Sequence, residues 1–291
     1  MDWRPIVMEI PFFRDQTNLL NSIALLRNAR LDQFFLFLDY FDTLYFAMIL
    51  IPIIWIGISD RWGLRVAILL IFSALLNYHL KHLFDFPRPI VASPHLPMLS
   101  FNDPGFPSGA AQTATLLSGL LIYAWKNPWA WVIAISYTTL ICFSRLYLGV
   151  HYPFDILGGI AIGLALLFIY TTSIEYIEKF LKKQGRGFCV LISVLFCFLY
   201  EFFLPSPQGS RLIGAFLGFA VGAYASLLFS FYPTQPRPVW TRTSHVAVTI
   251  MGLFILLFLT PRYTPSLVQT LILSLWISLG AYPLCETVVG D

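Results

Sequence analysis

Long apolar runs constrain the fold of this chain more than any motif does. A helix needs about 20 predominantly apolar residues to cross a bilayer. Hydrophobic residues make up 58% of the 291 residues and charged residues 11%, whereas soluble domains average about 45–50% and about 25%. We therefore expect an all-α, polytopic membrane protein with about nine transmembrane helices. The nine predicted spans cover residues 34–58, 63–84, 107–125, 128–147, 154–174, 187–204, 211–232, 245–261 and 265–285.

Residues 16–33 have a different pattern, because leucines there alternate with charged and polar residues. This pattern favours an amphipathic helix at the membrane interface, and the alternative is an N-terminal extension of the first span. We expect one membrane domain, in which 1–33 is an interfacial segment, 63–174 the catalytic core and 187–285 additional spans. Glycines four residues apart in the fifth and seventh spans indicate close helix packing: Gly159, Gly163, Gly214, Gly218 and Gly222.

The Lys and Arg residues of the loops predict the orientation, because cytoplasmic loops carry an excess of them. The N-terminal segment and the site residues below are left out of the comparison. Loops predicted to lie on the non-cytoplasmic side of the membrane then carry only Arg211 and Arg262. The N-terminus is therefore expected outside and the C-terminus in the cytoplasm. The loops predicted to be cytoplasmic carry Arg61, Arg65, Lys126, Lys179, Lys182, Lys183, Arg186, Arg237 and Arg242.

Three polar clusters interrupt the apolar pattern, and all three lie at ends of predicted spans on the outer, non-cytoplasmic face. Charged residues against a bilayer are expensive, so each cluster is a candidate functional site. The first cluster contains Lys81 and Arg88, and the second is Pro107-Ser108-Gly109. The third runs from Ser144-Arg145 to His151 and Asp155.

The residue types of these clusters point to a phosphate site. Lys81, Arg88 and Arg145 would repel one another unless an anion lay between them, and guanidinium groups match phosphate oxygens. Ser108 and Gly109 lie at a helix start, where free N–H groups favour an anion.

His151 and Asp155 are four residues apart, which places them on one helix face. A carboxylate bonded to one imidazole nitrogen leaves the other nitrogen free. This arrangement is suited to a nucleophile or a base.

In order and spacing, the three clusters resemble the three-part signature of the type 2 phosphatidic acid phosphatase superfamily over about residues 77–163. That superfamily includes lipid phosphate phosphatases, glucose-6-phosphatase and the vanadium haloperoxidases. The resemblance implies that His151 attacks phosphorus to form a phosphohistidine, that Asp155 orients His151, and that water releases the phosphate. It implies no metal or other cofactor. The residues it assigns to the phosphate oxygens are Lys81, Arg88, Ser108, Gly109 and Arg145.

Ala110 departs from the pattern of the superfamily, which has a histidine after Pro-Ser-Gly or Pro-Ser-Thr. That histidine would protonate the departing oxygen, and a positioned general acid contributes about 10²–10⁴-fold. We therefore expect a chain that binds phosphate but turns over poorly. An engineered substitution and a naturally degenerate relative would both explain Ala110. The intact remainder of the motif favours the first explanation.

The expected substrate is a lipid phosphate or diphosphate, because a site at the interface takes a headgroup while the tail stays in the bilayer. A sugar phosphate is the alternative, since nine spans with an outer N-terminus resemble glucose-6-phosphatase as well as sphingosine-1-phosphate phosphatases. A non-catalytic phospholipid binder or transporter is a third interpretation if Ala110 is native. The expected partners are membrane lipids and not nucleic acid. Other candidate pocket residues are Asp39, Asp42, Asn77, His82 and Asp85.

Overall fold

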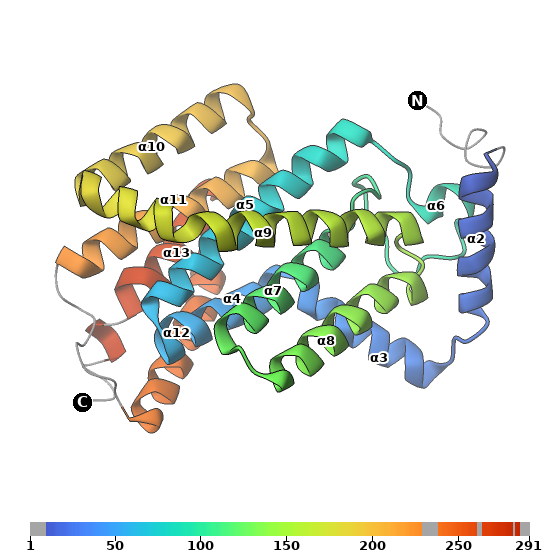
Figure 1. The fold of residues 1–291 in the computed structure, drawn as a ribbon, viewed down its shortest axis with the longest axis horizontal. Helices are drawn as coiled ribbons and strands as arrows, with labels where there is room; N and C mark the ends of the chain where they lie inside the picture. The colour runs from blue at the N-terminus through green and yellow to red at the C-terminus, as the bar shows by residue number, and fades with distance from the viewer. Residues whose placement is uncertain (1–9, 229–237, 261–263, 282, 286–291) are drawn as a thin grey trace. The chain divides into compact units, whose positions relative to one another are not determined.

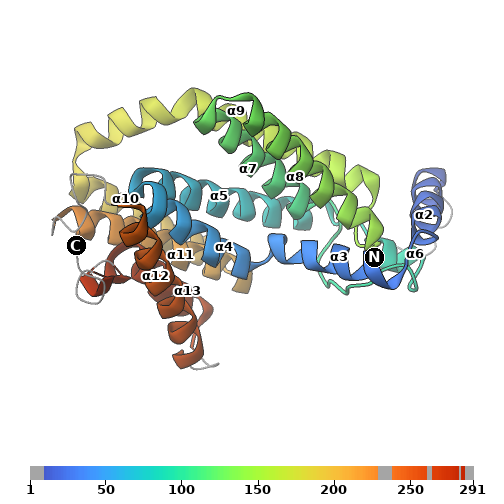
Figure 2. The ribbon, with the colours of Figure 1, turned by 90° about the horizontal axis from the view of Figure 1, so that it is seen from below.

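The computed structural model describes residues 10–228, 238–260, 264–281 and 283–285, and every regular element in them is a helix (Figures 1 and 2). Arg237 and Arg262, used above for orientation, lie outside the described residues. The chain divides into two compact units. Unit 1 comprises residues 1–43 and 76–174, and unit 2 comprises residues 44–75 and 175–291. Helices α5 (Asp60–Phe84) and α9 (Pro153–Gln184) each contribute to both units.

The N-terminal segment forms two helices, so the expectation of one amphipathic helix over 16–33 was wrong. Helix α2 (Pro11–Ala24) begins with proline at its first position, and α3 (Ala29–Asp39) begins after Asn28. The Asn28 side chain accepts hydrogen bonds from the backbone N–H groups of Arg30 and Leu31 at 3.2 and 3.1 Å. This cap satisfies the open N–H groups of α3 and starts a new helix.

The predicted first span, 34–58, is not one continuous helix. Helix α3 continues into the 3₁₀ turn η1 (Tyr40–Asp42), and Thr43 then has extended backbone angles of φ −102° and ψ 161°. The chain resumes as α4 (Leu44–Pro52) and the π-helical turn η2 (Ile53–Ile58). Thr43 therefore breaks the hydrogen-bond ladder inside a segment whose composition alone indicated a single helix.

Helices α7 (Gly109–Trp125), α8 (Pro128–Tyr147) and the first part of α9 form the centre of unit 1 and run side by side (Figures 1 and 2). Gly159 lies against the backbone oxygen of Ser108. A Cβ atom on Gly163 would lie 2.8 Å from the backbone oxygen of Gln112. The close packing predicted for these two glycines is confirmed, and it brings the starts of α7 and α9 together. A short helix, α6 (Pro89–Ala92), and a loop to residue 108 connect α5 to α7.

Unit 2 contains α10 (Arg186–Phe203), α11 (Pro207–Leu228), α12 (Val239–Leu259), α13 (Ser266–Leu275) and the π-helical turn η3 (Trp276–Gly280). Its buried apolar core includes Trp55, Ile213 and Leu253. Helix α11 packs directly on α13, and a Cβ atom on Gly218 would lie 2.7 Å from the backbone oxygen of Leu271. The small-residue pattern of the seventh predicted span is therefore a packing surface.

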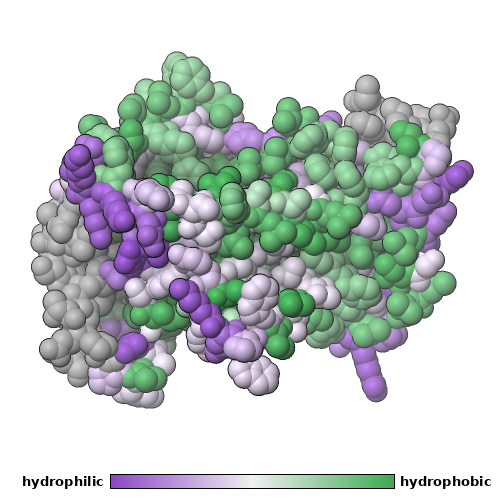
Figure 3. All heavy atoms as spheres, in the orientation of Figure 1, coloured by the Kyte–Doolittle hydropathy of each residue, from purple (hydrophilic) through white to green (hydrophobic). Residues whose placement is uncertain are grey.

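Four helical segments among the described residues are long and apolar enough to cross a membrane: Asp60–Ala92, Pro128–Tyr147, Pro153–Gln184 and Val239–Leu259. The helices on either side of Thr43 would make a fifth if they count as one broken span. The expected nine spans are not confirmed. Helix α7, for example, has 17 residues, which gives about 26 Å against a hydrocarbon core of about 30 Å. These helices and the hydrophobic surface over α8 and α9 (Figure 3) support a multi-pass helical membrane protein.

Candidate active site

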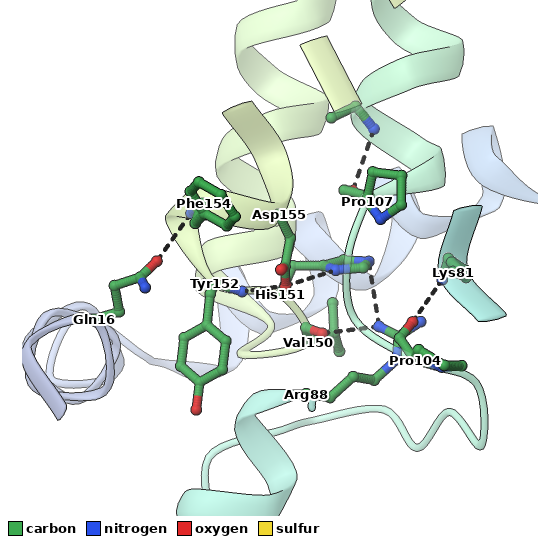
Figure 4. A network of polar contacts seen from close by, with 12 residues as sticks. Gln16, Lys81, Arg88, Pro104, Pro107, Val150, His151, Tyr152, Phe154 and Asp155 are labelled. Atoms are coloured by element: carbon green, nitrogen blue, oxygen red, sulfur yellow. Dashed lines mark hydrogen bonds and ion pairs between the residues drawn. The ribbon is translucent and has the colours of Figure 1, made fainter. Parts of the chain in front are cut away.

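The third cluster places a histidine and an aspartate in contact (Figure 4). Helix α9 begins at Pro153, so Asp155 lies in the first turn of the helix, next to the side chain of His151. The distance from His151 Nδ1 to Asp155 Oδ2 is 3.3 Å, and Asp155 Oδ2 also accepts the backbone N–H of Tyr152 at 2.8 Å. His151 is 5% exposed and Asp155 is 2% exposed. The carboxylate is thus held by the helix start and is available to orient the imidazole.

The other nitrogen of His151, Nε2, lies 3.2 Å from Nη1 of Arg88. A guanidinium group only donates hydrogen bonds, so Nε2 must accept, and the imidazole proton belongs on Nδ1, which faces Asp155. Burial lowers the pKa of His151 well below 6.5, and the positive charges of Arg88, Lys81 and Arg145 lower it further. His151 is therefore a neutral imidazole with its lone pair directed at a cationic group.

Lys81 and Arg88 are buried at the end of α5 and at the start of α6. Both bind Asp103, a residue of the loop before α7. Lys81 forms an ion pair with the Asp103 carboxylate and donates to the backbone oxygen of Pro104 at 3.0 Å. Arg88 donates from Nη2 to Asp103 Oδ1 at 2.8 Å and from Nε to the Asp103 backbone oxygen at 2.8 Å. Burial alone would raise the pKa of Asp103, but Lys81 and Arg88 lower it below its usual value.

Arg145, the third predicted phosphate ligand, is 1% exposed on α8. Its Nη1 donates to Asp39 Oδ1 at 2.6 Å, and its Nε donates to the Ser144 hydroxyl at 3.1 Å. Its Nη2 is buried and has no hydrogen-bond partner among the described residues. Buried donors are nearly always paired, so this nitrogen is a candidate position for an anion.

Ser108 and Gly109 connect the second cluster to the third. Ser108 is fully buried and caps α7, since its hydroxyl accepts the backbone N–H of Ala111 at 3.4 Å. Its own backbone N–H donates to the backbone oxygen of Asp155 at 2.9 Å. Gly109 lies against Asn77, whose Oδ1 would be 3.2 Å from a Cβ atom at that position. The N-terminus of α7 is thereby fixed beside the start of α9.

Ala110 is 2% exposed and belongs to a buried apolar cluster with Phe35 and Leu38 of α3. A methyl group at this position has no proton to give. The first turn of α7 therefore has backbone N–H groups that favour an anion, but it has no ionisable side chain at position 110.

Some of the predicted pocket residues lie at the site and others do not. Asp39 pairs with Arg145, and Asp42 lies close enough to Arg145, Lys81 and Arg88 to interact with their charges. His82 and Asp85 are exposed. The ion pairs differ from the prediction for Asp85, because Asp103 and not Asp85 pairs with Lys81 and Arg88 among the described residues. Asp85 has φ 48°, at the point where the chain leaves α5. Sequence reasoning missed Asp103, whose only signal is an acidic residue directly before the loop dipeptide Pro104-Gly105.

The N-terminal segment forms hydrogen bonds with backbone groups beside the site. The sequence did not indicate these contacts. Arg27 donates from Nη2 to the backbone oxygens of Leu96 and Tyr147, at 2.7 and 2.8 Å. It thereby ties the loop before α7 to the end of α8. Gln16 of α2 accepts the backbone N–H of Phe154, in the first turn of α9, at 2.9 Å (Figure 4).

Comparison with known proteins identifies proteins to which this chain is similar. Residues 62–179 match the PAP2 superfamily. The chain is 26% identical over 209 residues to lipid phosphate phosphatase delta of Arabidopsis thaliana, an alignment that covers 65% of the chain and 49% of the plant protein. It is 28% identical over 171 residues to undecaprenyl-diphosphatase BcrC of Bacillus subtilis, which covers 58% of the chain and 88% of that protein. The chain thus spans about half the length of the plant relative.

A solved structure has the same fold over much of its length. The crystal structure of a transmembrane PAP2-type phosphatidylglycerolphosphate phosphatase from Bacillus subtilis superposes with a TM-score of 0.50 and 24% identity. The superposition covers 60% of this chain and 94% of that one. The segment that matches the PAP2 superfamily, residues 62–179, contains all three polar clusters. Together, these findings show that the chain is similar in sequence to the PAP2 superfamily of membrane phosphatases.

Proposed function

We propose that this chain is a membrane phosphatase that removes a phosphate group from a lipid through a phosphohistidine. The observation that carries the proposal is the buried, neutral His151, which has Asp155 on one ring nitrogen and Arg88 on the other. Two further buried cations, Lys81 and Arg145, are close enough to lower its pKa. A phosphate placed among these cations would lie next to the lone pair of Nε2.

In the proposed first step, Nε2 of His151 attacks phosphorus and the bond from phosphorus to the leaving oxygen breaks. Lys81, Arg88 and Arg145 stabilise the charge on the other phosphate oxygens. The unpartnered Nη2 of Arg145 is placed to donate to one of them. Asp155 accepts a hydrogen bond from the Nδ1–H of His151 and stabilises the positive imidazole that forms. In the second step, water attacks phosphorus, the P–N bond breaks, and phosphate leaves with Nε2 neutral again.

Ala110 affects substrates unequally in this mechanism, because the leaving oxygen receives no proton from position 110. An alcohol leaving group is a very weak acid, with a pKa near that of water, about 15.7. A phosphate leaving group has a second pKa of about 6 and departs without help. The chain as it stands should therefore cleave a diphosphate better than a phosphate monoester.

A lipid substrate is supported by the names of the relatives and by the exposed apolar residues of α8 and α9, such as Trp131, Leu164 and Phe168. The loop charges support a site on the non-cytoplasmic face, with the N-terminus outside and the C-terminus in the cytoplasm. A lipid could present its phosphate at the ends of α5, α8 and α9 while its tail remains among the membrane lipids.

The test is a phosphate-release assay on the detergent-purified chain and its Ala110→His variant. Phosphatidate, a polyprenyl diphosphate and glucose 6-phosphate serve as substrates. We expect Ala110→His to raise kcat on phosphatidate by about 10²–10⁴-fold and to raise kcat on the diphosphate by less. Glucose 6-phosphate should be the poorest substrate.

Ala110→Gln is the matched control, since it adds a polar side chain of similar size without an ionisable group. It should leave kcat at the level of the parent. Background activity of Ala110→His on all three substrates would contradict a phosphatase. Retained phosphate binding in that case would favour a non-catalytic binder.

A further inference from the structure

Asp103 occupies the position where a phosphate would be expected to bind. Its two carboxylate oxygens are divided between two cations: Oδ1 accepts from Nη2 of Arg88 at 2.8 Å, and Oδ2 pairs with Nζ of Lys81. Carboxylates and phosphates both present acceptor oxygens only, and both are bound by charge-assisted hydrogen bonds. Asp103 therefore binds this pair of cations in the way that two oxygens of a phosphate group would.

The remaining contacts of Arg88 leave little room for a second anion. Its Nε donates to the Asp103 backbone oxygen, and its Nη1 contacts the Val150 backbone oxygen at 2.9 Å and Nε2 of His151. All three guanidinium nitrogens of Arg88 are thus engaged. One N–H of Nη2 remains, so a phosphate that takes two donors of Arg88 must replace one of these partners. Backbone oxygens are fixed by the chain, so the Asp103 side chain, which is 39% exposed on a loop, is the partner most easily replaced.

Arg145, the third cation, has a different set of contacts. Arg145 has no contact with Asp103 among the described residues, and its Nη2 is buried without a partner. Arg145 is also paired with a carboxylate, that of Asp39, but its Nη2 remains open to an anion. Lys81 and Arg88, in contrast, share the Asp103 carboxylate of the same chain.

We propose that Asp103 is a competing anion, which holds Lys81 and Arg88 together in the ligand-free protein and which the substrate phosphate must displace. The proposal rests on the proposed function, since it assumes that phosphate binds these cations. In the absence of ligand, Asp103 offsets the repulsion between two buried positive charges. When phosphate binds, the apparent affinity is reduced by the fraction of molecules in which Asp103 occupies the site.

Asp103→Asn isolates this effect, because it removes the negative charge and leaves the backbone oxygen that binds Arg88 Nε in place. Binding of inorganic phosphate to the detergent-purified full chain is measured by calorimetry. We expect Asp103→Asn to tighten binding by about tenfold. Asp103→Glu keeps the carboxylate and should bind like the parent. Asp85→Asn removes an exposed negative charge nearby and should also bind like the parent.

Thermal unfolding provides a second measurement. Without phosphate, Asp103→Asn should unfold at a lower temperature than the parent, because Lys81 and Arg88 lose their shared anion. Added phosphate should raise its unfolding temperature by more than it raises that of the parent. An unchanged or smaller rise, together with unchanged or weaker binding, would overturn the proposal.

Arg145→Gln separates failure of this inference from failure of the proposed function. If the parent binds phosphate, Arg145→Gln weakens that binding, and Asp103→Asn does not tighten it, the phosphate site stands and only the competition is wrong. If parent and Asp103→Asn bind no phosphate, or if Arg145→Gln does not alter the binding, the phosphate site itself is contradicted, and this inference with it.

Discussion

The two units bury polar groups of different kinds. In unit 1, the buried polar residues include Lys81, Arg88, Arg145 and Asp155. In the described part of unit 2, no buried residue is Lys, Arg, Asp or Glu, and most buried polar side chains are hydroxyls. Several hydroxyls bond the backbone of their own helix, as Ser278 does to Ser274 and Thr249 to His245, both at 2.7 Å.

The buried charges of unit 1 and the buried hydroxyls of unit 2 differ in what they require from the rest of the fold. A hydroxyl that bonds the preceding turn is satisfied within its own helix, so it needs nothing from its neighbours. A buried charge needs partners, and unpaired burial is costly. The partners of Arg88 come from the loop before α7 and from the turn before α9. Unit 1 therefore needs a specific tertiary arrangement at the cost of stability, which is typical of a functional site.

The comparison is tested most strongly by two buried histidines, one in each unit. In the Ala110→His background, His151→Gln should reduce kcat by at least about 10³-fold, because the proposed nucleophile is lost. His245→Gln, which alters a histidine 1% exposed in unit 2, should leave the kcat of the folded protein near that of its parent. Phosphate release from folded, size-selected protein measures both. Equal losses would show that the two units do not differ in chemical role.

The protonation state of His151 provides a second test of the difference between the two units. Its pKa in the folded chain lies well below the ordinary 6.5, so His151 should stay neutral as the pH falls through 6.5. NMR of labelled histidine, with the signal assigned by His151→Gln, measures this titration. Arg88→Gln should raise the pKa towards the ordinary value, although burial, the larger cause, remains.

The sign of the linked effect on stability follows from the same shift. The unfolded chain binds a proton at His151 more readily than the folded chain does, so this residue makes the folded state less stable as the pH falls below about 6.5. A titration of His151 at or above 6.5 in the parent would contradict the electrostatic account of unit 1.

The smallest expected effect is a packing change in unit 2. Gly218→Val places side-chain atoms against the backbone oxygen of Leu271 and should destabilise the chain by about 1–3 kcal/mol without changing kcat in the Ala110→His background. Gly187→Val is the control, because a Cβ atom there meets nothing within 4 Å. Denaturant unfolding in detergent measures the difference. A large loss of kcat with Gly218→Val would mean that unit 2 contributes to chemistry.

Part of this arrangement was predictable from the sequence, because charged residues at membrane depth are rare and stand out against apolar runs. Arg88 does lie against His151, while their chemical roles stay predictions. Asp103 was not predictable, since one aspartate in a loop has no periodic pattern to place it. Hydropathy also cannot detect a cap such as Asn28 or an extended residue such as Thr43, and these divide predicted helices into shorter ones.

The hydrogen bonds of Arg27 to the backbone oxygens of Leu96 and Tyr147 limit how residues 62–179 can be exchanged. The match to the PAP2 superfamily begins at residue 62, yet the guanidinium that joins the loop carrying Asp103 to the end of α8 belongs to residue 27. A chimera that grafts residues 62–179 into a PAP2 protein would carry the proposed nucleophile and the proposed phosphate ligands. It would leave behind the Arg27 side chain that bonds Leu96 and Tyr147, so the recipient would have to supply an equivalent contact.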